Sequence, residues 1–327
     1  MSRPSPTVVC AGVVVADHLS PPISHLPRAG ELVACDDLVL AIGGCASNAA
    51  AALAKLGVHA AVLGKVGDDV FGRFVAETLR AQGVDDRLLA IDRSRATSQT
   101  LIVNVKGEDR RFIHCFGANQ GLTVGDLAAA FDSLWAEGAS PSVFYLGGYL
   151  ILPGVDPTDL AAFLHDLRGR GITTLLDVAT PGPADYLSKL TPVLPEVDVF
   201  LPNTDEAKLI LGESDPIRQA QAFRDLGTRR VVVTMGEAGA VALSDHLRAK
   251  LGVFPVEFVD GTGGGDAFDA GYIAGLLDGL DEVGCLTFAS ALGASCVRAV
   301  GTTAGLFNRK QLQTFIQDHT LPIERLA

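Results

Sequence analysis

The sequence predicts an α/β protein in which a central, mostly parallel sheet is flanked by helices. Apolar segments of strand length alternate with amphipathic segments of helix length, 36 glycines supply tight turns, and 48% of the 327 residues are hydrophobic. Strands that alternate with helices are joined by right-handed crossovers, which place neighbouring strands parallel. The hydrophobic fraction is sufficient for a large buried core.

The first part of the chain begins this alternation. We expect strands at 7–15 and 60–66, and helices at 48–56 and 71–82. Gly57 and Gly83 directly follow the two helices, and glycine is a common residue just after a helix.

The second part of the chain continues in the same rhythm. The expected strands are 142–146, 173–177, 197–201, 230–234 and 253–259. The expected helices are 158–170, 204–211, 218–226, 266–280 and 282–299. The whole chain, 1–327, is therefore interpreted as one α/β domain.

Two stretches, about 18–40 and 91–116, interrupt the alternation. In the second, 97–105 and 110–116 are strand-like and 106–109 has the composition of a turn. Extra antiparallel strands at two places can form one small, discontinuous β lid. Leu101, Val103 and Val105 would lie on one face of it and Ile102 on the other. A small sheet with apolar residues on both faces must cover a ligand or a second copy of itself.

The most informative run is DGTGGGDAF at 260–268, between an expected strand and an expected helix. Glycines let the backbone approach a ligand, and the open N–H groups of a first helical turn favour an anion such as phosphate. A carboxylate beside such a site is a proton acceptor, so the run indicates phosphoryl transfer with Asp266 as general base. The alternative is a tight turn in which Asp266 is only a helix N-terminal acid.

Two other nucleotide-binding signatures do not fit. The dinucleotide fingerprint requires glycine or alanine where Asp266 stands, which disfavours a dehydrogenase. The P-loop requires Gly-Lys-Ser or Gly-Lys-Thr, and neither tripeptide occurs in the chain.

Six motifs together resemble the ribokinase-like (PfkB) carbohydrate kinases. They are GGCASN at 43–48, GKVGDDVFG at 64–72, GAN at 117–119, PNTDEA at 202–207, TMGEAG at 234–239 and DGTGGGDAF at 260–268. Their order and spacing match the family over nearly the whole chain. The resemblance implies a ribokinase-like fold and an ATP-dependent kinase that phosphorylates a hydroxyl, in most cases a primary one, of a sugar.

The resemblance also implies roles for individual residues. Asp266 would be the base, and the N–H groups of Gly263, Gly264 and Gly265 would form the anion hole. The sugar would contact Asp17, Gly43, Gly44 and Asn48. The nucleotide would contact Thr234, Gly236 and Gly239. Asn203 and Glu206 would hold Mg²⁺ through water. A monovalent cation such as K⁺ would bind near Asp260, Thr262, Cys296, Ala299, Gly301 and Gly305.

Each of these motifs also has a simpler interpretation. Asn203 and Glu206 fit a capping box at the start of a helix. The turn at 234–239 fits an ordinary strand end, and Asp17 fits a loop acid, although ligands collect at the carboxyl edge of parallel strands.

The chain departs from the family pattern at positions that affect the substrate. Gly147-Gly148-Tyr149 stands where several relatives present an acid, so Tyr149 is expected to stack on a ring or close the pocket. Residues 177–182 read DVATPG, which lacks the arginine of the family pattern. Arg95, Arg110 and Arg111 remain candidates for gripping a substrate phosphate, or form a solvated edge of the lid. A nucleoside kinase and a catalytically silent sugar or nucleotide sensor stay open as alternatives.

Charge and composition disfavour a nucleic-acid-binding protein, a membrane protein and a disulfide-bonded protein. A net charge of −12 disfavours nonspecific nucleic-acid binding. We expect no signal peptide and no membrane segment, because the uncharged stretch 38–54 contains Gly43, Gly44 and Asn48 and fits a strand followed by a helix. Six scattered cysteines predict reduced thiols in a cytoplasmic protein. The lid predicts a homodimer.

Overall fold

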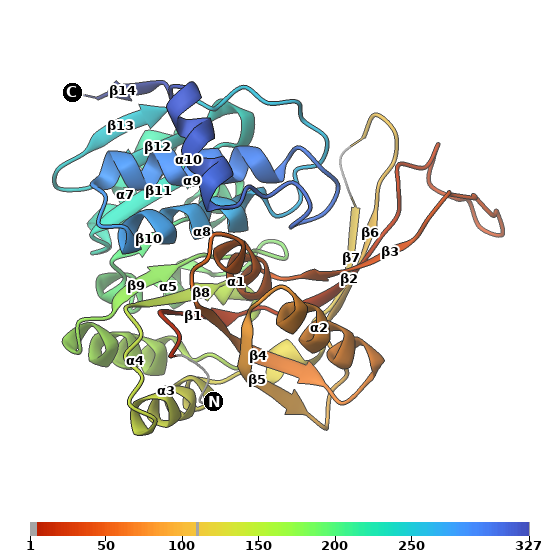
Figure 1. Cartoon of the computed structure of the whole chain (residues 1–327), viewed down its shortest axis with the longest axis horizontal. Helices are drawn as coiled ribbons and strands as arrows, with labels where there is room; N and C mark the ends of the chain where they lie inside the picture. Colours follow the sequence, from red (N-terminus) through yellow and green to blue (C-terminus); the bar gives the residue numbers. More distant parts are fainter. Residues whose placement is uncertain (1–4, 109–110, 327) are drawn as a thin grey trace.

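The computed structural model describes residues 5–108 and 111–326, which form a large twisted sheet between two layers of helices and a small sheet at one side (Figure 1). Within these residues the large sheet has ten strands. In spatial order they are β14 (Ile323–Arg325), β13 (Arg248–Leu251), β12 (Ala240–Leu243), β11 (Arg230–Thr234), β10 (Val199–Phe200), β9 (Thr173–Leu176), β8 (Val143–Gly147), β1 (Val8–Gly12), β4 (Ala60–Gly67) and β5 (Asp85–Asp92).

Seven of these strands, from β11 to β5, run parallel, whereas β12, β13 and β14 pair antiparallel. The sequence-based expectation of a mostly parallel sheet is therefore confirmed. The carboxyl ends of the parallel strands meet at one edge, where ligands bind in open α/β sheets.

Two helical layers cover the two faces of the large sheet. One layer contains α1 (Cys45–Lys55), α2 (Val70–Ala81), α8 (Gly264–Leu277), α9 (Glu282–Cys296) and α10 (Arg309–Asp318). The other contains α3 (Val124–Ala136), α4 (Pro157–Gly169), α5 (Leu187–Leu190), α6 (Thr204–Leu211) and α7 (Pro216–Asp225). Each layer buries its own apolar cluster against the sheet, and this burial is the main driving force for the fold.

The small sheet has the strand order β3 (Val39–Gly43), β2 (Val15–Leu19), β6 (Gln99–Val103) and β7 (Arg111–Cys115). It projects from the body beyond α1 and α2 (Figure 1). Its strands extend past the interrupted stretches inferred from sequence, since β2 already begins at Val15 and β3 ends at Gly43. Of the predicted turn at 106–109, Asp109 lies outside the described residues, as does Arg110.

Two expected strands differ in the structure. The segment 253–259 is irregular: Pro255 has no N–H for a ladder, Phe258 is 70% exposed, and the N–H of Val259 bonds the carbonyl of Val297. The expected strand 7–15 is divided, because the chain leaves the large sheet after Gly12 and enters the small one at Val15.

Asp69 fixes the small sheet to the body. One carboxylate oxygen accepts the N–H of Gly72 at 2.8 Å and the hydroxyl of Thr97 at 2.7 Å. The other accepts the N–H of Thr97 at 2.8 Å. Because Asp69 caps α2 and Thr97 leads into β6, this carboxylate sets where the lid begins.

Asn119 makes a second link. Its side chain accepts the N–H of Val14 at 3.2 Å and donates to the carbonyl of the same residue at 3.1 Å. The amide thus replaces a neighbouring strand at the point where the chain passes between the sheets.

None of the helices in the described ranges has the length and apolar character needed to cross a bilayer. The uncharged stretch 38–54 forms β3 and most of α1.

Candidate active site

The carboxylate of Asp266 lies in the first turn of α8 and is held by the N-terminal part of the chain. The amide nitrogen of Asn48, on α1, donates to an oxygen of Asp266 at 2.8 Å, although the two residues are 218 positions apart. Burial raises the pKa of Asp266 above its usual range, and the bond from Asn48 opposes this shift. The first and last motifs of the sequence therefore meet at one carboxylate.

The glycine turn before Asp266 is left-handed at Gly263 and open at Gly265. Gly263 caps α8 with φ +75°, a left-handed conformation that L side chains rarely adopt. A Cβ on Gly265 would have no neighbour within 4 Å, so the space before the helix is open. The first N–H groups of a helix have no intrahelical acceptor. The N–H of Gly264 bonds the carbonyl of Gly261 at 3.3 Å.

Asp17 lies on β2 of the small sheet, close enough to Asp266 for that charge to affect its pKa. It is 7% exposed, and a Cβ on Gly43 would overlap its carboxylate, so glycine is required there. Burial raises the pKa of Asp17 to about 6, and the negative charge of Asp266 adds to the effect. The side chains of Thr100 and His114 continue the row across the sheet, with 2.9 Å between the Thr100 hydroxyl and Nδ1 of His114.

Sequence inspection missed Thr100 and His114 as components of this surface. Nε2 of His114 is buried without a hydrogen-bond partner among the described residues. The sequence of strand 97–105 shows which of its own residues share a face. It does not show that this face lies beside Asp17, because that depends on the pairing of β2 with β6.

Asn203 and Glu206 form a complete capping box at the start of α6. The side-chain oxygen of Asn203 accepts the N–H of Glu206 at 2.9 Å, and Oε2 of Glu206 accepts the N–H of Asn203 at 2.9 Å. Burial raises the pKa of Glu206 to about 8, with a further contribution from the charge of Asp266. Glu206 is half-buried, and no basic side chain of the described residues forms an ion pair with it. Such a carboxylate suits Mg²⁺, which takes few carboxylates and keeps several waters.

The predicted nucleotide turn follows β11, next to the capping box. The N–H of Thr234 bonds the carbonyl of Pro202 at 3.0 Å, which places the turn beside Asn203. Gly236 and Gly239 have φ of +57° and +90°, and a Cβ on Gly239 would overlap the carbonyl of Leu251. The turn therefore needs glycine at both positions.

Asp260 joins the two segments of the predicted monovalent-cation loop. One oxygen accepts the N–H of Thr262 at 3.0 Å, and the other accepts the N–H of Gly301 at 2.9 Å. The thiol of Cys296 contacts the carbonyl of Thr262 at 3.4 Å. Ala299 and Gly305 lie in the connection that follows α9.

Sequence inspection also missed a contact between Cys45, Asp177 and Asp266. One ligand atom from each lies within 4.8 Å of the other two. Asp177 follows β9 and also accepts the N–H of Gly148 at 3.2 Å. Its position at the carboxyl end of a parallel strand was the available signal, the same one that pointed to Asp17.

The structure bears on the roles expected of Tyr149 and of the arginines near the lid, and the expected stacking by Tyr149 is wrong. Tyr149 is 1% exposed and packs in the core beneath the sheet, with its hydroxyl 3.5 Å from the carbonyl of Lys189, so it has no free face for stacking. Arg95 pairs with Asp92 of β5 at 3.0 Å, so it lies at the end of the large sheet, whereas Arg111 of the small sheet pairs with Glu108 and both of these side chains are exposed.

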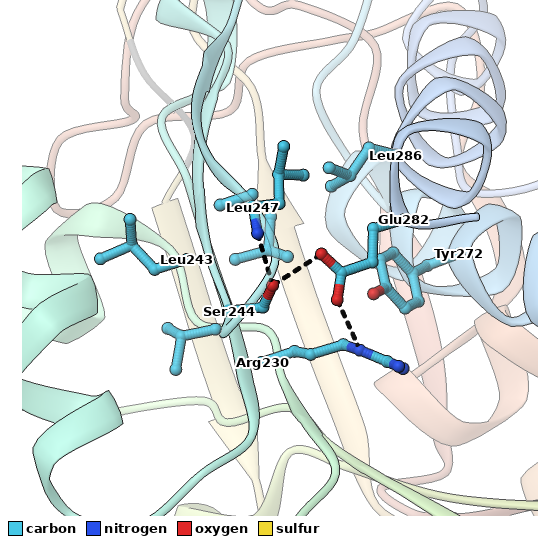
Figure 2. A pocket seen from close by; sticks show the side chains of 10 residues that line it. Arg230, Leu243, Ser244, Leu247, Tyr272, Glu282 and Leu286 are labelled. Atoms are coloured by element: carbon cyan, nitrogen blue, oxygen red, sulfur yellow. Dashed lines mark hydrogen bonds and ion pairs between the residues drawn. The ribbon is translucent and has the colours of Figure 1, made fainter. Parts of the chain in front are cut away.

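A separate cavity of about 320 Å³ lies at the opposite end of β11 and includes Arg230, Tyr272 and Cys285 in its lining. Figure 2 shows the adjoining recess, where Glu282 accepts hydrogen bonds from Arg230 at 2.9 Å and Ser244 at 2.7 Å. None of the predicted site residues lines this cavity.

Known proteins resemble the chain throughout its length. The model of the pfkB family carbohydrate kinases matches residues 5–308. A ribokinase of Haemophilus influenzae is 24% identical over 316 residues, covering 95% of this chain and 98% of the relative. A 2-dehydro-3-deoxygluconokinase of Bacillus subtilis is 28% identical over 289 residues, covering 84% and 86%.

A solved structure of Arabidopsis thaliana ribokinase, complexed with ribose and ATP, has the same fold. The TM-score is 0.78 at 21% identity, with 96% of this chain and 99% of that chain covered. Because the family model spans almost all of the residues that build the two sheets and the site, the chain belongs to the pfkB family of carbohydrate kinases, which transfer a phosphoryl group to an alcohol.

Proposed function

We propose that the chain is an ATP-dependent kinase of a sugar hydroxyl, in which Asp266 is the general base. The observation that carries this proposal is the bond from Asn48 to Asp266 at the start of α8. This bond orients the carboxylate of Asp266 beside the open glycine turn, and its donor is a neutral amide rather than a cation. The preference for a primary hydroxyl rests on the family resemblance.

Burial makes Asp266 a stronger base than an exposed aspartate, because it raises the pKa of the carboxyl. Asp266 removes the proton from the attacking hydroxyl, while the N–H groups of Gly263 and Gly265 would face the charge that develops on the phosphoryl group. The N–H of Gly264 would join them once it exchanges its 3.3 Å bond to the carbonyl of Gly261 for the phosphoryl group. Asn203 and Glu206 would hold Mg²⁺, which neutralises phosphate charge when bound.

The acceptor would lie between the body and the small sheet. Asp17, Asn48 and the backbone at Gly43 and Gly44 surround that space, and the side-chain oxygen of Asn48 has no partner among the described residues. An unpaired buried acceptor is costly unless a ligand donates to it, which a sugar hydroxyl does. The nucleotide would lie along Thr234, Gly236 and Gly239.

The variant Asp266→Asn tests the base. We expect turnover with ATP and Mg²⁺ to fall about 10²- to 10⁴-fold, since the amide cannot accept the proton. ATP affinity should change little. Asp159→Asn is a matched control, because Asp159 occupies the same position in the first turn of α4 and lies on the surface. Comparable losses in both variants would show that Asp266 acts only as a helix N-terminal acid.

The acceptor class is tested by ADP release. The panel contains pentoses, hexoses, sugar acids, phosphosugars and nucleosides, each with ATP and Mg²⁺. We expect the highest kcat/KM with a neutral sugar, because Asp17, Asp177 and Asp266 repel anions from this space. A preferred phosphosugar or a preferred nucleoside would overturn the substrate assignment.

We further propose that the small sheet closes the site and pairs with the lid of a second copy. Leu40, Leu101 and Ile113 lie in one row of the sheet and are 36%, 40% and 67% exposed. Light scattering at micromolar concentration should give the mass of a dimer, and Leu101→Gln with Ile113→Gln should give the monomer mass. Ile91→Gln, at a 63% exposed site on β5, is the control. A wild-type monomer would refute this pairing.

The loop closed by Asp260 is our proposed site for K⁺. Carbonyl oxygens of this loop would supply most of the ligands. Activity measured in K⁺ should exceed that in tetramethylammonium at equal ionic strength, and equal rates in the two salts would refute the site.

A further inference from the structure

The floor of the site contains a thiol between two carboxylates. Cys45 is the first residue of α1, Asp177 follows β9, and Asp266 lies in the first turn of α8. One ligand atom from each residue lies within 4.8 Å of the other two, and all three residues are half-buried. The proposed phosphoryl transfer uses only Asp266 of this group.

The thiol lies near both carboxylates. The charges of Asp266 and Asp177 contribute to raising the pKa of the Cys45 thiol, after burial as the main cause. Asp269 and Glu206 also lie close enough to raise the pKa of Asp177. Carboxyls crowded in this way can ionise together only when a cation lies among them.

A second observation points to a missing ligand. Asn48 is 5% exposed, and its side-chain oxygen has no hydrogen-bond partner among the described residues. It lies one helical turn after Cys45, on the same face of α1, and its nitrogen already holds Asp266. The free oxygen therefore borders the same group and offers a fourth donor atom when no sugar hydroxyl occupies it.

We propose that Cys45, Asp177 and Asp266 form a binding site for a thiophilic divalent cation such as Zn²⁺. Zinc binds sulfur at about 2.3 Å and carboxylate oxygen at about 2.1 Å, which places tetrahedral ligand atoms about 3.6 Å apart. The three atoms, now within 4.8 Å of one another, would have to move closer to reach that distance. Binding replaces the S–H bond by an S–Zn bond, and the proton leaves to solvent.

The donor set separates this site from the proposed Mg²⁺ site. Thiolate ligands select zinc-like metals, whereas Mg²⁺ prefers oxygen ligands and water. Asn203 and Glu206 offer no sulfur. A cation on Asp266 also occupies the lone pairs that would accept the hydroxyl proton, so zinc would inhibit the kinase. Only this inhibitory consequence rests on the proposed function.

The site is tested with Co²⁺, whose bond to a thiolate gives a near-ultraviolet charge-transfer band. The full chain carrying Cys35→Ser and Cys115→Ser, which removes the two exposed cysteines, is titrated without Mg²⁺. We expect one Co²⁺ per chain with a thiolate band. Adding Cys45→Ser should abolish the band, and adding Asp177→Asn should weaken binding at least 10-fold. Circular dichroism and ATP binding establish that each variant is folded.

Three outcomes would overturn the site: no thiolate band in the parent, a band that survives Cys45→Ser, or unchanged affinity in Asp177→Asn. In a separate arm, micromolar Zn²⁺ should inhibit the parent, and a zinc-selective chelator should restore activity. Undiminished turnover in Asp266→Asn would refute the proposed base, yet the Co²⁺ band would still establish the metal site. If turnover depends on Asp266 but no Co²⁺ band is seen, the proposed base would be supported and the metal site refuted.

Discussion

The large sheet and the small sheet differ in how far their apolar side chains are covered by other parts of the chain. Strand β8 of the large sheet is buried along its whole length, because helices cover both faces. Strand β7 of the small sheet is mostly exposed, and Ile113 at its centre is 67% exposed. The large sheet is therefore stabilised within the chain, whereas the small sheet retains apolar surface for a ligand or a second copy.

Matched leucine truncations should give the largest contrast between the two sheets. Leu146 on β8 is fully buried and Leu101 on β6 is 40% exposed. We expect Leu146→Ala to lower the free energy of unfolding by about 3–5 kcal/mol, through lost burial and an unfilled cavity. Leu101→Ala should change it by less than about 0.5 kcal/mol in the monomer. Urea unfolding measures both, and equal losses would contradict the contrast.

A second prediction concerns the acid that the small sheet buries. Burial raises the pKa of Asp17 to about 6, above the ordinary value near 4. From about pH 4 to 6 the native chain holds a proton that the unfolded chain has released, so the free energy of unfolding decreases as pH rises. A difference of about 2 pKa units corresponds to about 3 kcal/mol.

The variant Asp17→Asn should therefore be more stable than wild type by up to about 3 kcal/mol at pH 7.5 and equally stable near pH 4. Thermal unfolding at the two pH values checks this, with Asp36→Asn as an exposed control in the same part of the chain. A stability gain that is the same at both pH values would contradict the role of Asp17 ionisation. Affinity for the acceptor should fall, because Asp17 faces it.

The smallest expected effect is at the joint between the sheets. Asp69→Asn loses at least one of the three hydrogen bonds that hold Gly72 and Thr97, because the amide nitrogen cannot accept an N–H, at a cost of about 1–2 kcal/mol. We expect faster hydrogen exchange in β6, unchanged exchange in β8, and a KM for the acceptor raised about 10-fold. Asp68→Asn, at the exposed neighbouring position, should behave as wild type. Faster exchange in both strands would show that Asp69 stabilises the whole chain.

Local sequence signals predicted much of the body. The bounds of α6 and β11 agree with the expected 204–211 and 230–234, since a capping pair and a continuous β-branched run mark them. Strand β5 was missed because its residues alternate weakly and begin with two acids. Helix α10 was missed because few of its residues are apolar. The segment 253–259 was predicted as a strand from its β-type residues. In the structure it is irregular, as Pro255 would indicate.

The site was predictable where residues lie close in sequence. The glycine turn before Asp266 and the capping pair Asn203 and Glu206 each fall within one short motif. The contacts of Asp266 with Asn48, Cys45 and Asp177 depend on three separate elements, and no local pattern shows which carboxyl ends of strands become neighbours. Pairing of β2 with β6, which aligns Thr100 with Asp17, is equally non-local.

The bond between Asn48 and Asp266 has a consequence during synthesis. Asn48 leaves the ribosome long before Asp266, whose carboxylate it orients, and α9, which packs on α8, emerges later still. Truncated or still-growing chains that stop before these helices therefore lack the Asp266 carboxylate and the bond that orients it.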